Sequence, residues 1–87
     1  MMTEVKMMAA CKAGLQLLAA AGGVGIREDA LRDQLNYAAG GNLEPVEIDT
    51  VMTRLNERKW MSWYRDPTWN QIRWTISATG SLALQAM

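Results

Sequence analysis

The stretch that decides the fold is WMSWYRDPTWNQIRWTI at residues 60–76. It contains two runs in which apolar and polar side chains alternate, and an Asp-Pro-Thr-Trp-Asn segment at 66–70 separates them. Alternation with a period of two is typical of a strand with one buried face, and Asp, Pro and Asn favour turns. The stretch therefore predicts a β-hairpin over residues 60–76, with Ile72, Trp74 and Ile76 on one face of its second strand.

Three helices are predicted before this hairpin. The first, residues 3–21, is rich in strong helix formers, begins at the capping residue Thr3 and ends at Gly22-Gly23. Its apolar residues recur every three or four positions and predict a buried stripe of Val5, Met8, Cys11, Leu15 and Leu18. The second helix covers residues 27–39, has Leu31, Leu35 and Ala38 on its apolar face, and ends at Gly40-Gly41-Asn42.

The third helix covers residues 45–59. Proline is favoured at the first helical position, where its missing N–H removes no hydrogen bond, so Pro45 marks the start. The residues expected to face the core are Ile48, Val51, Met52 and Leu55. After the hairpin, Ser77 is expected to cap a last helix at residues 78–86, with Leu82 and Leu84 as apolar anchors. The chain is thus expected to form one domain, residues 1–87, of the α+β class and mostly α.

Two passages around the hairpin resemble a known family. Residues 55–61, LNERKWM, are similar to the L-x-x-x-G-[LW]-[VI] passage that leads from the recognition helix into the wing of winged helix-turn-helix domains. Residues 65–67, RDP, and 73–80, RWTISATG, resemble the run that closes the wing and starts the last helix. Such runs occur in PadR-like and MarR-like regulators and in small winged helix proteins of Mu-like prophages. The resemblance implies three helices, a hairpin wing and a C-terminal helix.

One position departs from that pattern. The family usually has glycine where the recognition helix ends, because the backbone there enters the left-handed region, and this chain has Lys59. Lysine in that conformation costs about 1 kcal/mol relative to glycine. We therefore expect either a strained Lys59 or a different helix end.

Charge is balanced overall but divided along the chain. The net charge is zero, from nine Lys and Arg and nine Asp and Glu. Residues 1–49 hold four basic and seven acidic side chains, a balance of −3, and residues 50–87 hold five basic and two acidic side chains, a balance of +3. A strongly basic domain would indicate nucleic acid, whereas this modest asymmetry does not decide the class of partner.

The sequence favours a cytoplasmic protein without a membrane partner. The first residues lack the basic flank and continuous apolar core of a secretory signal. The apolar stretch at residues 7–24 is mostly Ala and is interrupted by Lys12, Gln16 and glycines, which makes it a weak membrane segment. Cys11 is the single cysteine, so an intrachain disulfide is impossible, and its place on the apolar stripe predicts an inert thiol.

Catalysis has few residues available. The chain contains no histidine, no Cys-x-x-Cys and no Gly-x-Ser-x-Gly. The glycines at 22–25 lack the preceding strand and following lysine of a phosphate loop, and the acids Glu28, Asp29 and Asp33 are better explained as partners of a helix dipole than as metal ligands. We expect no enzyme activity, no metal and no cofactor.

The third helix is the first candidate binding element. The resemblance implies that its outward residues face a DNA major groove, and the candidate DNA-binding residues are Thr50, Thr53, Arg54 and Arg58. Thr hydroxyls and Arg can bond phosphates or base edges. Glu47, Asp49 and Glu57 lie on or near the same surface and would repel phosphates. An ordinary solvated face is the alternative.

The wing is the second candidate element. Its candidate DNA- or partner-binding residues are Arg65, Trp69, Asn70 and Arg73. The alternative for Arg65 and Arg73 is a solvated pair of cross-strand neighbours. Trp69 lies at a turn, where a large aromatic side chain has little to pack on, so it indicates a contact with DNA or protein. Trp60, Trp63 and Trp74 are expected to fill the core in place of phenylalanine, which the chain lacks, with at least two of them buried.

The first helix has a second apolar face, formed by Met7, Ala10, Ala13, Gly14 and Leu17. A helix that is apolar most of the way round is either central in its domain or shared with a partner. Residues 3–21 are therefore a candidate homodimer interface.

Two functions follow as hypotheses. The first is a small double-stranded-DNA-binding protein, a transcriptional regulator or phage accessory factor that acts as a homodimer. The second is a protein-interaction module, such as a phage-encoded inhibitor or adaptor, that binds a protein partner through the same surface. The placement of Arg54, Arg58, Arg65 and Arg73 should discriminate them: convergence on one surface favours DNA, and scatter favours protein.

Overall fold

The computed structural model describes residues 2–38, 40–41 and 43–87. Four helices and three strands follow one another in the order α1 (Glu4–Ala21), the 3-10 turn η1 (Gly22–Val24), β1 (Ile26–Arg27), α2 (Glu28–Ala38), α3 (Pro45–Glu57), β2 (Met61–Asp66), β3 (Gln71–Ile76) and α4 (Ala78–Ala86). The fold is α+β and mostly helical, as predicted. Ala39 and Asn42, at the predicted end of the second helix, lie outside the described residues.

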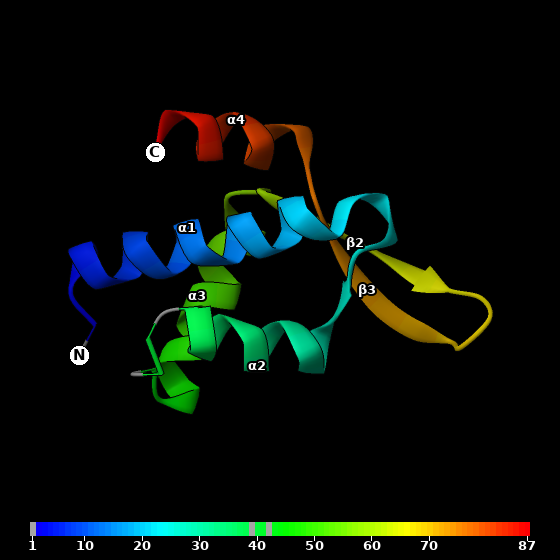
Figure 1. The fold of residues 1–87 in the computed structure, drawn as a ribbon, viewed down its shortest axis with the longest axis horizontal. Helices are drawn as coiled ribbons and strands as arrows, with labels where there is room; N and C mark the ends of the chain where they lie inside the picture. The colour runs from blue at the N-terminus through cyan, green and yellow to red at the C-terminus, as the bar shows by residue number, and fades with distance from the viewer. Residues whose placement is uncertain (1, 39, 42) are drawn as a thin grey trace.

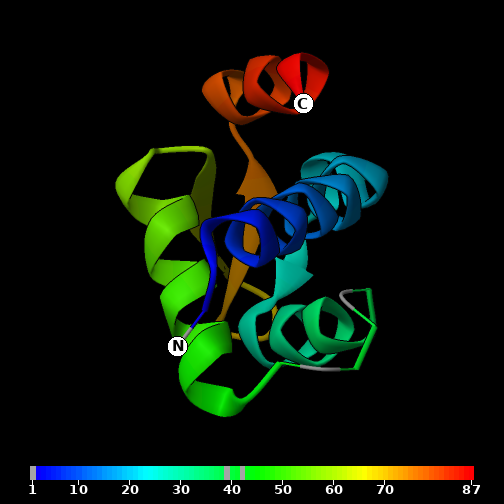
Figure 2. The same cartoon turned by 90° about the vertical axis from the view of Figure 1, so that its left-hand side faces the viewer.

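Helix α1 is the central element of the fold. Figure 2 shows it surrounded by α2, α3 and α4. It begins where Thr3 Oγ1 accepts a hydrogen bond from Lys6 N at 3.1 Å, as expected of a cap. Its buried residues come from both predicted apolar faces and are Met7, Ala10, Cys11, Ala13, Gly14, Leu15 and Leu18.

The predicted stripe on α1 is wrong at its N-terminal end. Val5 is 82% exposed and Met8 is 37% exposed, whereas Met7 and Ala10 are buried. The second apolar face contacts other elements of the same chain here, so the buried stripe is rotated away from Val5 and Met8. The segment Glu4–Val24 has the length and hydropathy of a membrane-spanning helix, and in this structure it occupies the position of a core helix.

Helix α3 ends in a left-handed residue. The N–H of Lys59 donates to Asn56 O and the N–H of Trp60 donates to Leu55 O, each at 3.0 Å, which is the hydrogen-bond pattern of a Schellman motif. Lys59 occupies the position that glycine usually takes and has φ +57°. Of the two outcomes expected for this position, the chain therefore adopts the strained lysine.

The hairpin is part of a three-stranded antiparallel sheet. Strand order is β1-β3-β2, and β1 pairs Ile26 with Trp74 and Arg27 with Arg73. The sequence did not predict β1, because a two-residue strand has no detectable period. Gly25 precedes it, and a Cβ at this position would lie 2.6 Å from Trp74 O, so only glycine lets the two strands approach this closely.

Helix α4 is attached to the end of α3. Ser77 Oγ accepts from Gly80 N at 2.9 Å and donates to Lys59 O at 2.6 Å, while Ser77 N donates to Trp60 O at 3.0 Å. The predicted cap is therefore confirmed. Of the two predicted anchors, Leu84 packs against the core, but Leu82 is 67% exposed because α4 lies over α1 at the edge of the molecule (Figure 1).

The tryptophans do not behave alike. Trp74 is buried, at 8% exposure, and Trp60 is half-buried against the core. Trp63 is 58% exposed, so its predicted burial is wrong. It pairs with Trp74 across the hairpin and shares its sheet face, but it belongs to the edge strand. Figure 1 shows the hairpin projecting beyond the helices, and Trp63, on the edge strand β2, stays exposed.

Candidate binding surface

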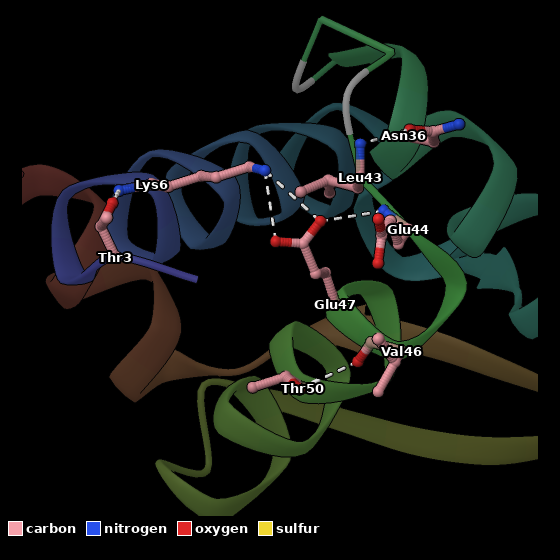
Figure 3. Close-up of polar contacts among 8 residues, drawn as sticks. All are labelled: Thr3, Lys6, Asn36, Leu43, Glu44, Val46, Glu47 and Thr50. Atoms are coloured by element: carbon pink, nitrogen blue, oxygen red, sulfur yellow. Dashed lines mark hydrogen bonds and ion pairs between the residues drawn. The ribbon is translucent and has the colours of Figure 1, made fainter. Parts of the chain in front are cut away.

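Several exposed side chains of α3 are uncharged. Val46 is 64% exposed, and Thr50 and Thr53 are exposed as predicted for binding residues. Thr50 Oγ1 donates to Val46 O in the same helix at 2.9 Å, as Figure 3 shows. Its hydroxyl proton is thus engaged, and the oxygen can still accept a hydrogen bond from a ligand.

Two acids of α3 are paired within the chain. Glu47 lies between α3 and α1, where Lys6 Nζ approaches its Oε2 at 3.2 Å and Glu44 N donates to its Oε1 at 3.0 Å (Figure 3). The backbone hydrogen bond from Glu44, followed by that from Lys6, lowers the pKa of Glu47. Asp49 pairs with Arg32 of α2. These carboxylates are therefore neutralised locally, which the sequence did not predict.

The arginines of α3 are also engaged. Arg54 Nη1 lies 3.2 Å from Glu4 Oε1 of α1, and its side chain is 26% exposed. The Arg58 guanidinium lies 5.7 Å from the centre of the Trp60 ring, which is within cation–π range. Arg54 therefore points toward α1, while Arg58 is exposed at the C-terminal end of α3.

The hairpin turn is held by its own polar side chains. Asp66 accepts from Thr68 N at 2.9 Å and from Arg73 Nε at 3.1 Å. The backbone hydrogen bond from Thr68, more than the contact with Arg73, lowers the pKa of Asp66. Arg65 Nη1 donates to Asn70 Oδ1 at 3.0 Å, and Asn70 has φ +53°, a conformation that Asn tolerates better than most residues.

The four candidate arginines do not share one surface. Arg65 pairs with Ile72, and Arg73 pairs with Tyr64. Because side chains alternate between faces along a strand, Arg65 and Arg73 point to opposite faces of the hairpin. Arg54 faces α1. The two hairpin arginines are thus not cross-strand neighbours, and the arginines scatter.

The hairpin exposes aromatic side chains instead. Trp69 at the turn is 68% exposed, as expected, and Trp63 is 58% exposed. Tyr64 is 38% exposed and its hydroxyl donates to Val24 O at 2.7 Å. The sequence predicts a core position for Trp63, because the alternation of β2 does not reveal which part of the strand the helices cover.

A shallow groove of about 320 Å³ separates α3 from the hairpin. Its floor is apolar and consists of Met52, Met61 and Trp74, each at least nine-tenths buried. Glu28, Thr53, Asn56 and Glu57 line its rim. The sequence predicts for Glu28 only the role of a partner to the dipole of its helix. The structure also places Glu28 Oε1 3.3 Å from Trp74 Nε1, and a contact between residues so far apart in sequence leaves no local signal.

A second hollow, of about 550 Å³, lies between the N-terminal end of α1 and the start of α3. Met2, Lys6, Val46 and Glu47 are among its lining residues. The charged pair Lys6–Glu47 spans it (Figure 3). Because the two charges neutralise each other, this hollow offers a ligand no net electrostatic attraction from the pair.

Chemical reactivity is low at the one thiol. Cys11 is fully buried on α1, and burial raises its pKa, which disfavours the reactive thiolate. Within residues 2–38, 40–41 and 43–87, no three Asp, Glu or Cys side chains gather as a metal site would require.

No protein-family model, curated protein or solved structure matches this chain.

Proposed function

We propose that the chain is a winged helix domain that binds a partner protein through α3 and the hairpin. The winged helix assignment is supported by the order α1, β1, α2, α3, β2, β3 and by β1, which joins the hairpin as a third strand. The Schellman end of α3, at the position of the family's glycine, also agrees with it. In this assignment α3 is the recognition helix and the β2–β3 hairpin is the wing.

The scattered positions of the arginines favour a protein partner over DNA. DNA binding draws its affinity from basic side chains that converge on phosphates. Here Arg54 and Arg73 are engaged by Glu4 and Asp66, and Arg65 and Arg73 face opposite sides. Exposed tryptophans on a projecting hairpin are instead typical anchors of protein interfaces.

Binding of double-stranded DNA is the second candidate function. Its support is the pairing of Glu47 with Lys6 and of Asp49 with Arg32, which removes part of the repulsion expected at α3. Thr50, Thr53 and Arg58 would then contact the duplex, and Arg65, Asn70 and Arg73 would contact the flanking backbone.

A capture experiment separates the two functions. Tagged protein is incubated with nuclease-treated lysate of its native cell, and the same protein is titrated with duplex DNA at low salt. We expect a retained protein that is lost with Trp69→Ala or Trp63→Ala. Tyr37→Ala is the matched control, since Tyr37 is an 86% exposed aromatic on α2. Duplex binding that weakens steeply with salt, without any protein retained, would establish the DNA function instead.

Homodimerisation through residues 3–21 stays a prediction. The apolar side chains that motivated it are mostly covered by α2, α3 and α4 of the same chain. On α1, Val5, Met8 and Ala9 remain exposed for such a contact. Sedimentation of the purified protein at two concentrations tests it.

A further inference from the structure

The groove between α3 and the hairpin combines an apolar floor with an acidic rim. Met52, Met61 and Trp74 form the floor and come from three different elements. Glu28 from α2 and Glu57 from α3 are the charged side chains that line this groove within the described part of the chain. Both are exposed, and none of the ion pairs found among the described residues includes either of them.

A hydrogen bond from a neutral group does not remove the negative charge of this rim. Glu28 accepts a hydrogen bond from the indole N–H of Trp74 at 3.3 Å, which leaves its negative charge uncompensated. By contrast, the other two acids of α3, Glu47 and Asp49, each have a basic partner. The acidic charge of this surface is therefore concentrated at the groove.

An exposed aromatic ring lies next to one residue of the groove floor. Trp63 is 58% exposed and pairs with Trp74 across the hairpin, so both rings lie on one sheet face. A tryptophan face attracts Lys and Arg side chains through its quadrupole. The rim thus offers two carboxylates, and the ring of Trp63 beside the floor residue Trp74 is a third group that favours a cation.

We propose that this groove binds a short partner-protein segment in which an apolar side chain lies between Lys or Arg residues. This inference rests on the proposed protein-binding function and specifies its site and the chemistry of the partner. The apolar side chain contacts Met52, Met61 and Trp74, and the flanking cations approach Glu28 and Glu57. A volume of about 320 Å³ is at the small end of ligand pockets, which fits one or two side chains.

The same charges make this groove unsuitable for a nucleic acid. In the DNA arrangement, α3 and the hairpin both face the duplex, and the groove between them lies against its backbone. Glu28 and Glu57 would then be held near phosphates, where like charges repel. Binding of duplex DNA at this groove would therefore contradict the inference.

The probe is a short synthetic peptide with a central Leu–Leu pair flanked by Lys and Arg, compared with a peptide in which Glu replaces each basic residue. Both are titrated into ¹⁵N-labelled full-length protein. We expect the basic peptide to shift the Trp74 indole N–H and the amides of Thr53, Asn56 and Met61, and the acidic peptide to shift none. The amide of Tyr37, an exposed residue of α2 outside the groove lining, provides an internal reference signal.

Charge variants test the role of the rim. Glu57→Lys should weaken binding of the basic peptide about tenfold, as expected when one favourable exposed contact becomes repulsive, and Glu57→Gln should weaken it less. Asp33→Lys is the matched control, because Asp33 is an exposed acid of α2 outside the groove lining and undergoes the same charge change. We expect it to change the affinity less than twofold.

The inference is overturned if the basic peptide leaves the groove signals in place, if the acidic peptide shifts them equally, or if Glu57→Lys and Asp33→Lys behave alike. Duplex DNA that shifts the groove signals also overturns it. These results leave the proposed function standing as long as the partner capture still depends on Trp63 and Trp69. Loss of that dependence refutes the function itself, so the two failures are distinguishable.

Discussion

Replacing Gly80 with alanine tests the attachment of α4. A Cβ at this position would lie 2.0 Å from Trp60 O and 3.0 Å from Ile76 Cγ1. The nearer contact is with backbone, which cannot rotate away, so α4 must move outward by more than 1 Å to restore an ordinary contact. That movement disturbs the hydrogen bonds of Ser77 with Lys59 and Trp60.

The expected change in the free energy of unfolding follows from opposing effects. Alanine is favoured over glycine within a helix by about 1 kcal/mol. Against this, overpacking costs about 1–3 kcal/mol, and weakening two hydrogen bonds costs about 1 kcal/mol each. We expect Gly80→Ala to lower the free energy of unfolding by about 2–4 kcal/mol, and each kcal/mol lowers the melting temperature by roughly 4–8 °C for a domain of this size.

Urea and thermal unfolding followed by circular dichroism measure this change. Gly23→Ala is the matched control, since a Cβ at Gly23 meets nothing within 4 Å, and we expect it to change stability by no more than about 0.5 kcal/mol. A Gly80→Ala variant as stable as the wild type would refute the close approach of α4 to Trp60.

Three other predictions concern strain, pH and exposure. Lys59→Gly should raise the free energy of unfolding by about 1 kcal/mol in urea titrations, because φ is +57° at this position; an unchanged midpoint contradicts the strain. The pKa values of Glu47 and Asp66 are lowered in the folded state, so their contribution to stability is present at neutral pH and is lost as pH falls through about 4 and below. Glu47→Gln should flatten this acid dependence in unfolding titrations, and a variant that keeps the full slope would exclude Glu47. Quenching of the tryptophan fluorescence by acrylamide should fall strongly in Trp69→Phe, because this ring is 68% exposed. It should change little in Trp74→Phe, because that ring is 8% exposed.

The helices and the hairpin were predictable because their signals are local. Pro45, Ser77 and the alternation of residues 60–76 each define an element within a few positions, and the structure has these elements close to the predicted bounds. β1 was not predictable, since two residues carry no period and its partner β3 is far along the chain.

The candidate site was less predictable than the fold. The exposure of Thr50, Thr53 and Trp69 follows from their local positions, whereas the partners of Arg54 and Glu47 do not. Glu4 and Lys6 reach α3 only because α1 crosses it, and no pattern within α3 contains that information. The exposure of Trp63 likewise depends on where the helical layer stops.

The pairing of β1 with β3 closes the chain into a ring that contains α2, α3 and β2. Gly40 and Gly41 lie on this ring, between α2 and α3, and both are exposed. A backbone cut there would give one fragment with α1, β1 and α2 and another with α3, the hairpin and α4. Each fragment would carry half of the core, and the strand pairing and the packing around α1 would hold the two together without a covalent link. The fold is therefore suited to division into two complementing pieces whose reassembly restores the α3 and hairpin surface.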